Sequence, residues 1–282
     1  MALPVMIGLV VFLIGPMIAS LVMSLTDWNI GLPPALVGVA NYRDLLTQDP
    51  LFWKSLGVTV YYTILVVPVS LAVAFGVAIA LNQKVRGLAF FRVVFYLPTL
   101  VPMVASAILW NWMFNPDLGL FNDFLKAVGM VPSKWTYSEA TVIPSLALMG
   151  IWGFGNIMVI FLAGLQGVPV HLYEAIALDG GGGWQKFRHI TLPMMSPIIF
   201  FNVVTGVVAA VQSFHQAYLM TSGGPNNGST FIVYYLYQTA FTKGQMGYAS
   251  ALAWVVFILC ALVTGALFKW AKQWVHYSME SR

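Results

Sequence analysis

Charged residues are scarce in this sequence. Asp, Glu, Lys and Arg make up 8% of the 282 residues, whereas hydrophobic residues make up 60%, and the mean hydropathy is +0.83. A water-soluble domain carries about 25% charged residues because its surface must face water. The sequence therefore excludes an ordinary soluble protein and predicts a chain that lies largely in lipid.

Residues for covalent, metal or nucleotide chemistry are also few. The single cysteine, Cys260, cannot form an internal disulfide, and none of the four histidines stands in a metal-binding spacing such as H-E-x-x-H. The phosphate-binding pattern G-x-x-x-x-G-K-[ST] is absent, and no nucleophile and base stand at a recognisable catalytic spacing. We therefore expect no enzyme activity, no metal site, no cofactor held by this chain and no nucleic-acid partner.

The scarce charges divide the chain into membrane spans. A membrane helix needs about 20 apolar residues, and a charge at its centre is costly. The stretches free of Asp, Glu, Lys and Arg are 3–25, 58–81, 93–115, 142–165, 197–219 and 247–268. The first stretch lacks the basic start and cleavage site of a signal peptide, so we expect it to remain as a span. These stretches predict an all-α membrane protein with six transmembrane helices.

The loop charges predict the orientation of these helices. With both termini in the cytoplasm, the inside segments 82–92, 166–196 and the tail from 269 carry eight Lys and Arg residues, and the outside loops carry five. This distribution follows the positive-inside rule. The outside loops are short, so we expect one transmembrane domain over 1–282. We interpret most of the prolines inside the spans, a group that includes Pro98 and Pro102, as packing kinks.

One inside loop, 166–196, is unusually polar and contains HLYEAIALDGGGGWQKFRHITLP. Pro169 can open a short amphipathic helix that Gly180 ends, and four glycines then permit a reversal before a second helical turn. Three interpretations remain open. The first helix could lie on the lipid surface, the glycines could cradle a phosphate, or the helix could dock in a groove of another protein.

The same loop resembles the cytoplasmic EAA loop of binding-protein-dependent ABC importer permeases. That pattern has Glu-Ala-Ala, three residues, Gly, nine residues and Ile-x-Leu-Pro. The positions that match it are Glu174, Ala175, Gly180, Ile190, Leu192 and Pro193, with Ile176 in place of the second Ala. The segments 95–122 and 220–241 resemble the carbohydrate-importing branch of this family.

The resemblance implies partners and roles. Such permeases pair with a second homologous permease subunit, two ATP-binding subunits and an extracytoplasmic solute-binding protein in the bacterial inner membrane. ATP and Mg²⁺ would bind to the partner ATPase. The helix at 170–180 would couple the permease to this ATPase. The coupling residues would be Glu174, Ala175, Ile176, Asp179 and Gly180. The expected cargo is a sugar, an oligosaccharide or a sugar-like polyol phosphate.

Polar residues inside the spans suggest a substrate path. Asn156 lies in the fourth predicted span, and Gln212 and Ser213 lie in the fifth. Their side chains can hydrogen-bond sugar hydroxyls, so Asn156 and Gln212 could face one cavity. For each residue taken singly, hydrogen bonding between helices is the preferred explanation. An ion-coupled secondary carrier is the alternative function, although the spans contain none of the ionisable residues such carriers use.

Overall fold

The computed structural model describes residues 3–83 and 86–275. In this part of the chain the structure is helical, and its β pairing is limited to isolated bridges between Thr26 and Leu36 and between Asn29 and Gln245. The chain divides into two compact units. Unit 1 comprises Met1–Val60 and Val211–Val263, and unit 2 comprises Tyr61–Ala210 and Thr264–Arg282.

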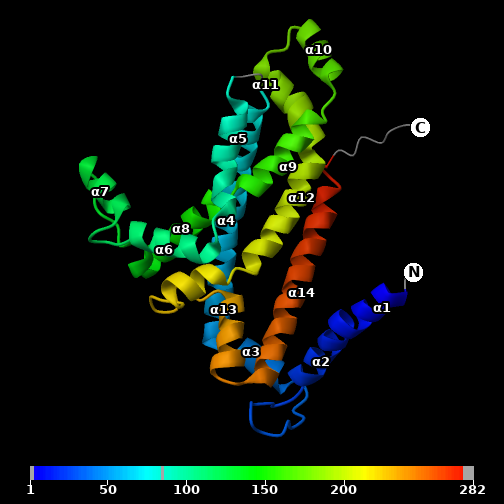
Figure 1. Cartoon of the computed structure of the whole chain (residues 1–282). Coiled ribbons are helices and arrows are strands. Elements are labelled where there is room, and N and C mark those ends of the chain that lie inside the picture. Colours follow the sequence, from blue (N-terminus) through cyan, green and yellow to red (C-terminus); the bar gives the residue numbers. More distant parts are fainter. Residues whose placement is uncertain (1–2, 84–85, 276–282) are drawn as a thin grey trace. The chain divides into compact units, whose positions relative to one another are not determined.

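The helices follow one another in this order (Figure 1). The first part of the chain contains α1 (Leu3–Leu9), η1 (Val10–Ile14), α2 (Gly15–Ser24), α3 (Ala40–Thr47), α4 (Pro50–Leu81), α5 (Leu88–Tyr96), η2 (Leu97–Leu100), α6 (Met103–Met113), α7 (Leu120–Ala127), η3 (Trp135–Tyr137) and α8 (Glu139–Trp152). The second part contains α9 (Gly155–Gln166), α10 (Val170–Leu178), α11 (Gly183–Lys186), η4 (Phe187–Thr191), α12 (Leu192–Val211), η5 (Ala217–Thr221), α13 (Ile232–Tyr237), η6 (Gln238–Thr242) and α14 (Met246–Ala271).

Two of the predicted spans, 3–25 and 247–268, are confirmed with nearly the predicted residue ranges. Continuous helix runs over Leu3–Ser24 and over Met246–Ala271, and both are long and apolar enough to cross a membrane. The second span was predicted to begin at 58, but its helix runs over Pro50–Leu81. The helix begins early because the Asp49 carboxylate accepts the backbone N–H groups of Leu51 and Phe52 at 2.9 and 3.1 Å. Asp at this position, followed by Pro at the first helical residue, is a favoured helix start.

Two predicted spans are sharply bent. The span predicted at 93–115 consists of Leu88–Leu100 and Met103–Met113, which meet at 94°. Treating Pro102 as a packing kink was therefore wrong. Val101 is extended, with φ −71° and ψ 124°, as is usual for a residue before proline. The span predicted at 142–165 consists of Glu139–Trp152 and Gly155–Gln166, which meet at 48°. The described residues thus offer four long apolar helices, or six spans if each bent pair is one.

The fifth predicted span, 197–219, was wrong at both ends. Helix runs from Gly183 to Val211 and passes through Pro193 and Pro197 without a break. The π-helical turn η4 just before Pro193 relaxes the α-helical hydrogen-bond pattern at the place where proline lacks its N–H. The helix ends at Val211, so Gln212 and Ser213 follow the helix instead of lying within it.

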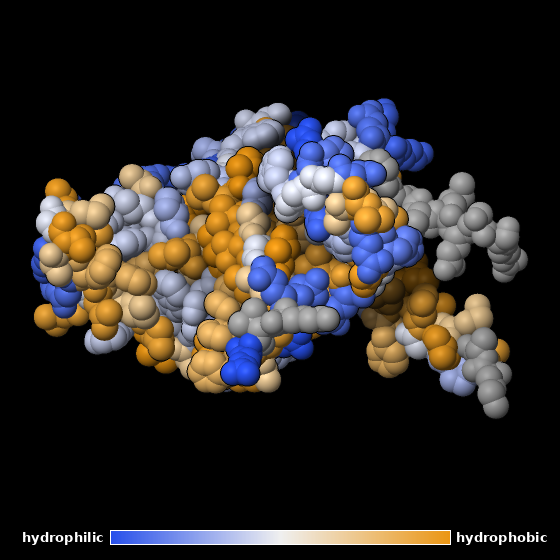
Figure 2. Space-filling view, turned by 90° about the horizontal axis from the view of Figure 1, so that it is seen from above, coloured by the Kyte–Doolittle hydropathy of each residue, from blue (hydrophilic) through white to orange (hydrophobic). Residues whose placement is uncertain are grey.

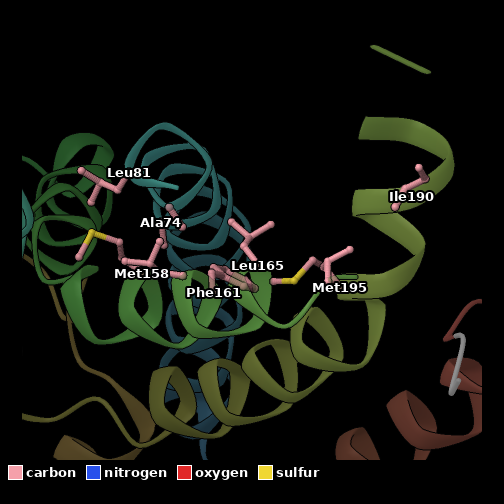
Figure 3. Close-up of a cluster of buried hydrophobic side chains, with 10 residues drawn as sticks. Ala74, Leu81, Met158, Phe161, Leu165, Ile190 and Met195 are labelled. Atoms are coloured by element: carbon pink, nitrogen blue, oxygen red, sulfur yellow. The ribbon is translucent and has the colours of Figure 1, made fainter. Parts of the chain in front are cut away.

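Each unit has its own hydrophobic core. In unit 2, α4, α9, η4 and α12 contribute to one cluster, shown in Figure 3. Its buried members are Ala74, Ala78, Leu81, Met158, Phe161, Leu162, Leu165, Val168, Ile190 and Met195. In unit 1 the corresponding cluster joins α3, α4, α13 and α14, with Leu45, Phe52, Ile232, Tyr235, Leu252 and Val256 buried.

Contacts in the structure bring some of the predicted loops together. Leu81, which precedes the predicted inside segment 82–92, and Leu88, which lies within it, contact the same core as α10 of the predicted inside segment 166–196. In unit 1, Lys54 near the start of α4 donates from Nζ to the carbonyl of Asn226, which belongs to a predicted outside loop. The side of the membrane that each group faces remains a prediction, and Lys84 and Arg282, which the charge count included, lie outside the described residues.

Much of the surface is apolar. Figure 2 shows hydrophobic side chains over large areas of the visible face. In the most apolar window of Leu3–Ser24, none of the residues is buried inside the chain, and Phe12 is 81% exposed. Exposed apolar areas of this size are typical of lipid-facing or subunit-facing surfaces.

Candidate functional site

The polar loop folds as the sequence predicts, as a helix, a glycine turn and a second helix. Pro169 precedes the first helix with extended backbone, φ −62° and ψ 129°, and α10 runs from Val170 to Leu178. Figure 1 shows α10 beside α11 at one end of unit 2. The predicted start at Pro169 and the stop near Gly180 are both confirmed.

The end of α10 is closed by a Schellman motif. Asp179 is the last residue with near-helical geometry, and Gly180 has φ +78°, a left-handed conformation that favours glycine. The N–H of Gly181 donates to the carbonyl of Ile176 at 2.8 Å, and the N–H of Gly180 donates to the carbonyl of Ala177 at 3.1 Å. These bonds pair two carbonyls that a helix end otherwise leaves unsatisfied.

The four glycines are not equivalent. A Cβ atom on Gly181 would lie 2.7 Å from the Ile176 carbonyl oxygen, which is too close. A Cβ atom on Gly182 or Gly183 would meet nothing within 4 Å. The Gln185 side-chain oxygen accepts the N–H of Gly182 at 2.6 Å and fixes the start of α11. The turn therefore requires Gly180 and Gly181, while the next two glycines are free to change.

One side of α10 is attached to the core of unit 2. Leu172, Tyr173 and Ile176 are half-buried and pack against the cluster formed by α4, α9 and α12. The hydroxyls of Tyr173 and Thr191 are hydrogen-bonded at 3.0 Å, and Thr191 is itself 8% exposed. Three side chains and a polar contact therefore hold α10 to the core of unit 2.

The opposite side of α10 is exposed in the part of the chain that the structure describes. Val170, Glu174 and Leu178, spaced four residues apart, are exposed, and Leu178 is 89% exposed. Residues at this spacing share one helix face. The face presents one carboxylate between two aliphatic side chains, with Ala175 exposed at its flank.

The structure places the predicted coupling residues on different sides. Glu174 and Ala175 lie on the exposed side, Asp179 and Gly180 form the helix cap, and Ile176 points to the chain's own core. Leu178 was not singled out from the sequence. Its position four residues after Glu174 places it on the same helix face. Because apolar residues occur on all sides of this helix, the sequence did not distinguish that face.

The predicted substrate-path residues all adjoin interruptions in apolar helices. Asn156 is the second residue of α9, directly after the 48° bend, and its side chain is exposed. Gln212 and Ser213 lie in the irregular segment after α12, with Gln212 exposed and Ser213 half-buried. Asn156 belongs to unit 2, whereas Gln212 and Ser213 belong to unit 1. A cavity shared by Asn156 and Gln212 remains a prediction.

The described residues include no group of three or more His, Cys, Asp or Glu side chains placed to hold a metal ion. The charged side chains Glu174, Asp179 and Arg188 of the loop are exposed.

Comparison with known proteins identifies the family. The family model described as "Binding-protein-dependent transport system inner membrane component" matches residues 72–279. The probable ABC transporter permease protein YesP of Bacillus subtilis is 40% identical over 278 residues, covering 97% of this chain and 90% of that protein. The trehalose/maltose transport system permease protein MalF of Thermococcus litoralis is 30% identical, with 92% of this chain and 88% of that protein covered.

A solved structure shows the same fold. A chain of a bacterial ABC transporter involved in the import of the acidic polysaccharide alginate aligns with a TM-score of 0.81 at 21% sequence identity. The alignment covers 97% of this chain and 94% of that chain. These matches agree with the charge-poor helices and with the loop between α9 and α12. The chain belongs to the family of binding-protein-dependent ABC transporter permeases, multi-pass proteins of the inner membrane.

Proposed function

We propose that this chain is a permease subunit that moves a carbohydrate into the cytoplasm, driven by ATP hydrolysis in a partner ATPase that grips α10. The observation that carries this proposal is the two-sided character of α10. One side is anchored in the core of unit 2, and the other presents Glu174 between Val170 and Leu178.

The anchoring side supplies the mechanical link. When the ATPase closes and shifts α10, Leu172, Tyr173 and Ile176 carry the shift to α4, α9 and α12 because these side chains pack on that cluster. The hydrogen bond between Tyr173 and Thr191 resists rotation of α10 about its own axis. Packed cores deform little, so movement at α10 becomes movement of whole helices.

The exposed side supplies the grip. A carboxylate that enters a protein groove loses hydration and needs a cation or several hydrogen-bond donors in return. Glu174 would therefore meet a basic group of the ATPase, and Ala175 and Leu178 would fill the apolar part of the groove. Ile176 and the cap at Asp179 and Gly180 would hold α10 at the correct angle.

The names of relatives support carbohydrate as the cargo. Among them are MalF, MsmF of Streptococcus mutans, a multiple sugar-binding transport system permease, and SmoG of Agrobacterium fabrum, a sulfoquinovosyl glycerol transport system permease. A structural neighbour was solved in complex with an alginate pentasaccharide-bound periplasmic protein. We extend this pattern to a solute-binding protein, a second homologous permease and two ATP-binding subunits as partners. ATP and Mg²⁺ would bind to the ATPase subunits.

The substrate path would run past the interrupted helices. Irregular backbone at membrane depth is stable only where protein covers it or where it lines a water-filled cavity. Asn156 and Gln212 place amides beside such interruptions, and an amide both donates to and accepts from sugar hydroxyls. Cysteines at 156 and 212, in a chain with Cys260 replaced by Ala, should react with a soluble thiol reagent in at least one transport state. Inaccessibility at both positions in every state would remove them from the path.

The coupling proposal is tested in reconstituted vesicles. The transporter with Glu174→Ala should assemble and retain ATP hydrolysis while transport per ATP falls by about tenfold or more, the expected loss for a desolvated charge contact. Asp123→Ala is the control, because Asp123 is an exposed carboxylate that pairs with Lys126, at 3.8 Å on the same helix. Unchanged transport per ATP in the Glu174 variant would refute the proposal. The family does not favour the ion-coupled carrier, for which ATP would be unnecessary.

A further inference from the structure

Unit 1 contains a polar cavity of about 260 Å³ that the coupling mechanism does not use. It lies between the segment that follows α2 and the start of α14. Its walls include Asp27, Trp28, Asn29 and Gln245, and its lining continues over Tyr235 and Tyr248. We call this cavity the mouth pocket. A predominantly polar hollow is unusual in a chain with so few charged residues.

The walls of the mouth pocket are tied to each other by backbone hydrogen bonds. The N–H of Ile30 donates to the carbonyl of Gly244, and the N–H of Gly247 donates to the carbonyl of Trp28, both at 2.9 Å. Asn41, which also lines the pocket, donates from its amide to the carbonyls of Ser24 and Thr26, both at 2.9 Å. The pocket is therefore preformed.

The two tyrosines at the pocket are fixed by one carboxylate. The hydroxyls of Tyr235 and Tyr248 donate to Asp49 Oδ2 at 2.5 and 2.7 Å. Their oxygens still have lone pairs that can accept a hydrogen bond. The ammonium of Lys243 lies 5.1 Å from the centre of the Tyr235 ring. Lys243 is not part of the pocket lining.

The remaining groups form a pattern that suits hydroxyl groups. The Asp27 carboxylate accepts one bond, from Asn29 at 3.0 Å, and has capacity for more. Gln245 is exposed and offers both a donor and an acceptor, and Trp28 offers an aromatic face. A sugar ring carries adjacent hydroxyls that donate and accept, and an apolar face that stacks on an indole.

The charge of the lining narrows the ligand class. Asp27 is the charged residue among the lining side chains, which include neither Lys nor Arg. A phosphate or carboxylate ligand would meet this negative charge with no cation in the lining to pair with it. A neutral, polyhydroxylated ligand meets no such repulsion.

We propose that the mouth pocket is a subsite for a neutral sugar unit at the extracytoplasmic entrance of the permease. This proposal rests on the proposed function for the orientation of the chain and for carbohydrate as the cargo. It narrows the cargo to neutral sugars and disfavours polyol phosphates and acidic sugars.

The test uses the assembled transporter in nanodiscs without solute-binding protein or nucleotide. Saturation-transfer NMR measures binding of six neutral sugars (maltose, trehalose, sucrose, raffinose, melibiose and xylobiose) and of two anionic probes (glycerol 3-phosphate and galacturonate). Gln245→Leu and Asp27→Asn should each weaken the binding of at least one neutral sugar by about fivefold or more, the scale of one or two lost hydrogen bonds. Gln48→Leu is the matched control, because Gln48 is exposed in the same unit and is not part of the pocket lining.

The outcomes separate this proposal from the proposed function. Neutral-sugar binding that falls in both pocket variants, with the control unchanged and all three proteins assembled, supports the subsite. If no neutral sugar responds to either variant, or if only an anionic probe does, the subsite proposal is overturned. A coupling defect in the Glu174 variant would still stand in that case, because it does not involve the mouth pocket.

Discussion

Replacing Gly181 by alanine tests how the end of α10 is built. In the structure the added Cβ would lie 2.7 Å from the Ile176 carbonyl oxygen and 2.9 Å from Ile176 Cγ1. Because real Cβ contacts are longer, the Gly181 N–H must move away from the carbonyl it now binds at 2.8 Å. Loss of such a bond costs about 0.5–1.5 kcal/mol. The frayed population of the α10 end should rise by about 2- to 13-fold, by the usual conversion of free energy to population.

Amide hydrogen exchange in nanodiscs measures this change directly. Peptides that cover 176–181 should exchange faster in Gly181→Ala by about the same factor, and transport per ATP should fall because the exposed face of α10 loses its fixed angle. Gly183→Ala is the matched control, since its Cβ meets nothing within 4 Å and alanine favours the first turn of α11. Equal exchange in the two variants would refute the assignment of the Schellman motif.

Two further predictions concern unit 1. Burial alone would raise the pKa of Asp49, but hydrogen bonds from Tyr235, Tyr248 and the backbone hold that pKa below its ordinary value of 3.8. The ionised Asp49 therefore stabilises the fold fully above its ordinary pKa, and this stabilisation is lost as the pH falls through the lowered pKa. In thermal melts in detergent, Asp49→Asn should lower the melting temperature at pH 7. The variant should also show a smaller decline of the melting temperature with acid below about pH 5. An unchanged acid profile would contradict this. Gly247→Ala should destabilise the start of α14 by about 1–3 kcal/mol, because its Cβ would lie 2.0 Å from the Thr26 carbonyl oxygen. Gly57→Ala is the control: a Cβ at this position meets nothing within 4 Å, so the variant should be neutral or stabilising in the same melts. Equal melting temperatures of the two glycine variants would exclude the close contact between residue 247 and the Thr26 carbonyl.

The existence of the helices could be predicted from the sequence, but their interruptions could not. Lipid excludes charge, so the charge-free stretches outline the spans. The break at Val101 could have been inferred from Pro102, which forces the residue before it into extended backbone. The end of α12 at Val211 has no such signal, because neither Gly nor Pro occurs at 212–214. We have no local physical account of that break.

The orientation of α10 is a second feature that could not be predicted from the sequence. The sequence predicts a short amphipathic helix here, and the structure packs Leu172, Tyr173 and Ile176 against the core of unit 2. A helix of nine residues with apolar side chains all round has no single preferred face. Tertiary contacts with Thr191 and the core of unit 2 decide the orientation. The cap at Gly180, by contrast, follows from local backbone geometry and was predictable.

The mouth pocket, like the orientation of α10, depends on tertiary contacts and not on local sequence. Asp27 and Gln245 are far apart in the sequence, and neither belongs to a recognisable motif. They meet because the loop after α2 pairs with the residues before α14 through the bridge between Asn29 and Gln245. Pairing of this kind depends on the fold of unit 1 and leaves no local pattern.

The most direct test of the account asks what touches the exposed face of α10 in the working transporter. A photo-activated cross-linker at Leu178, the 89% exposed residue of that face, should attach to the ATP-binding subunit. The same group at Ile176, on the side that packs in unit 2, should attach mainly within this chain. Cross-links from Leu178 to lipid or to this chain alone would contradict the coupling role of α10.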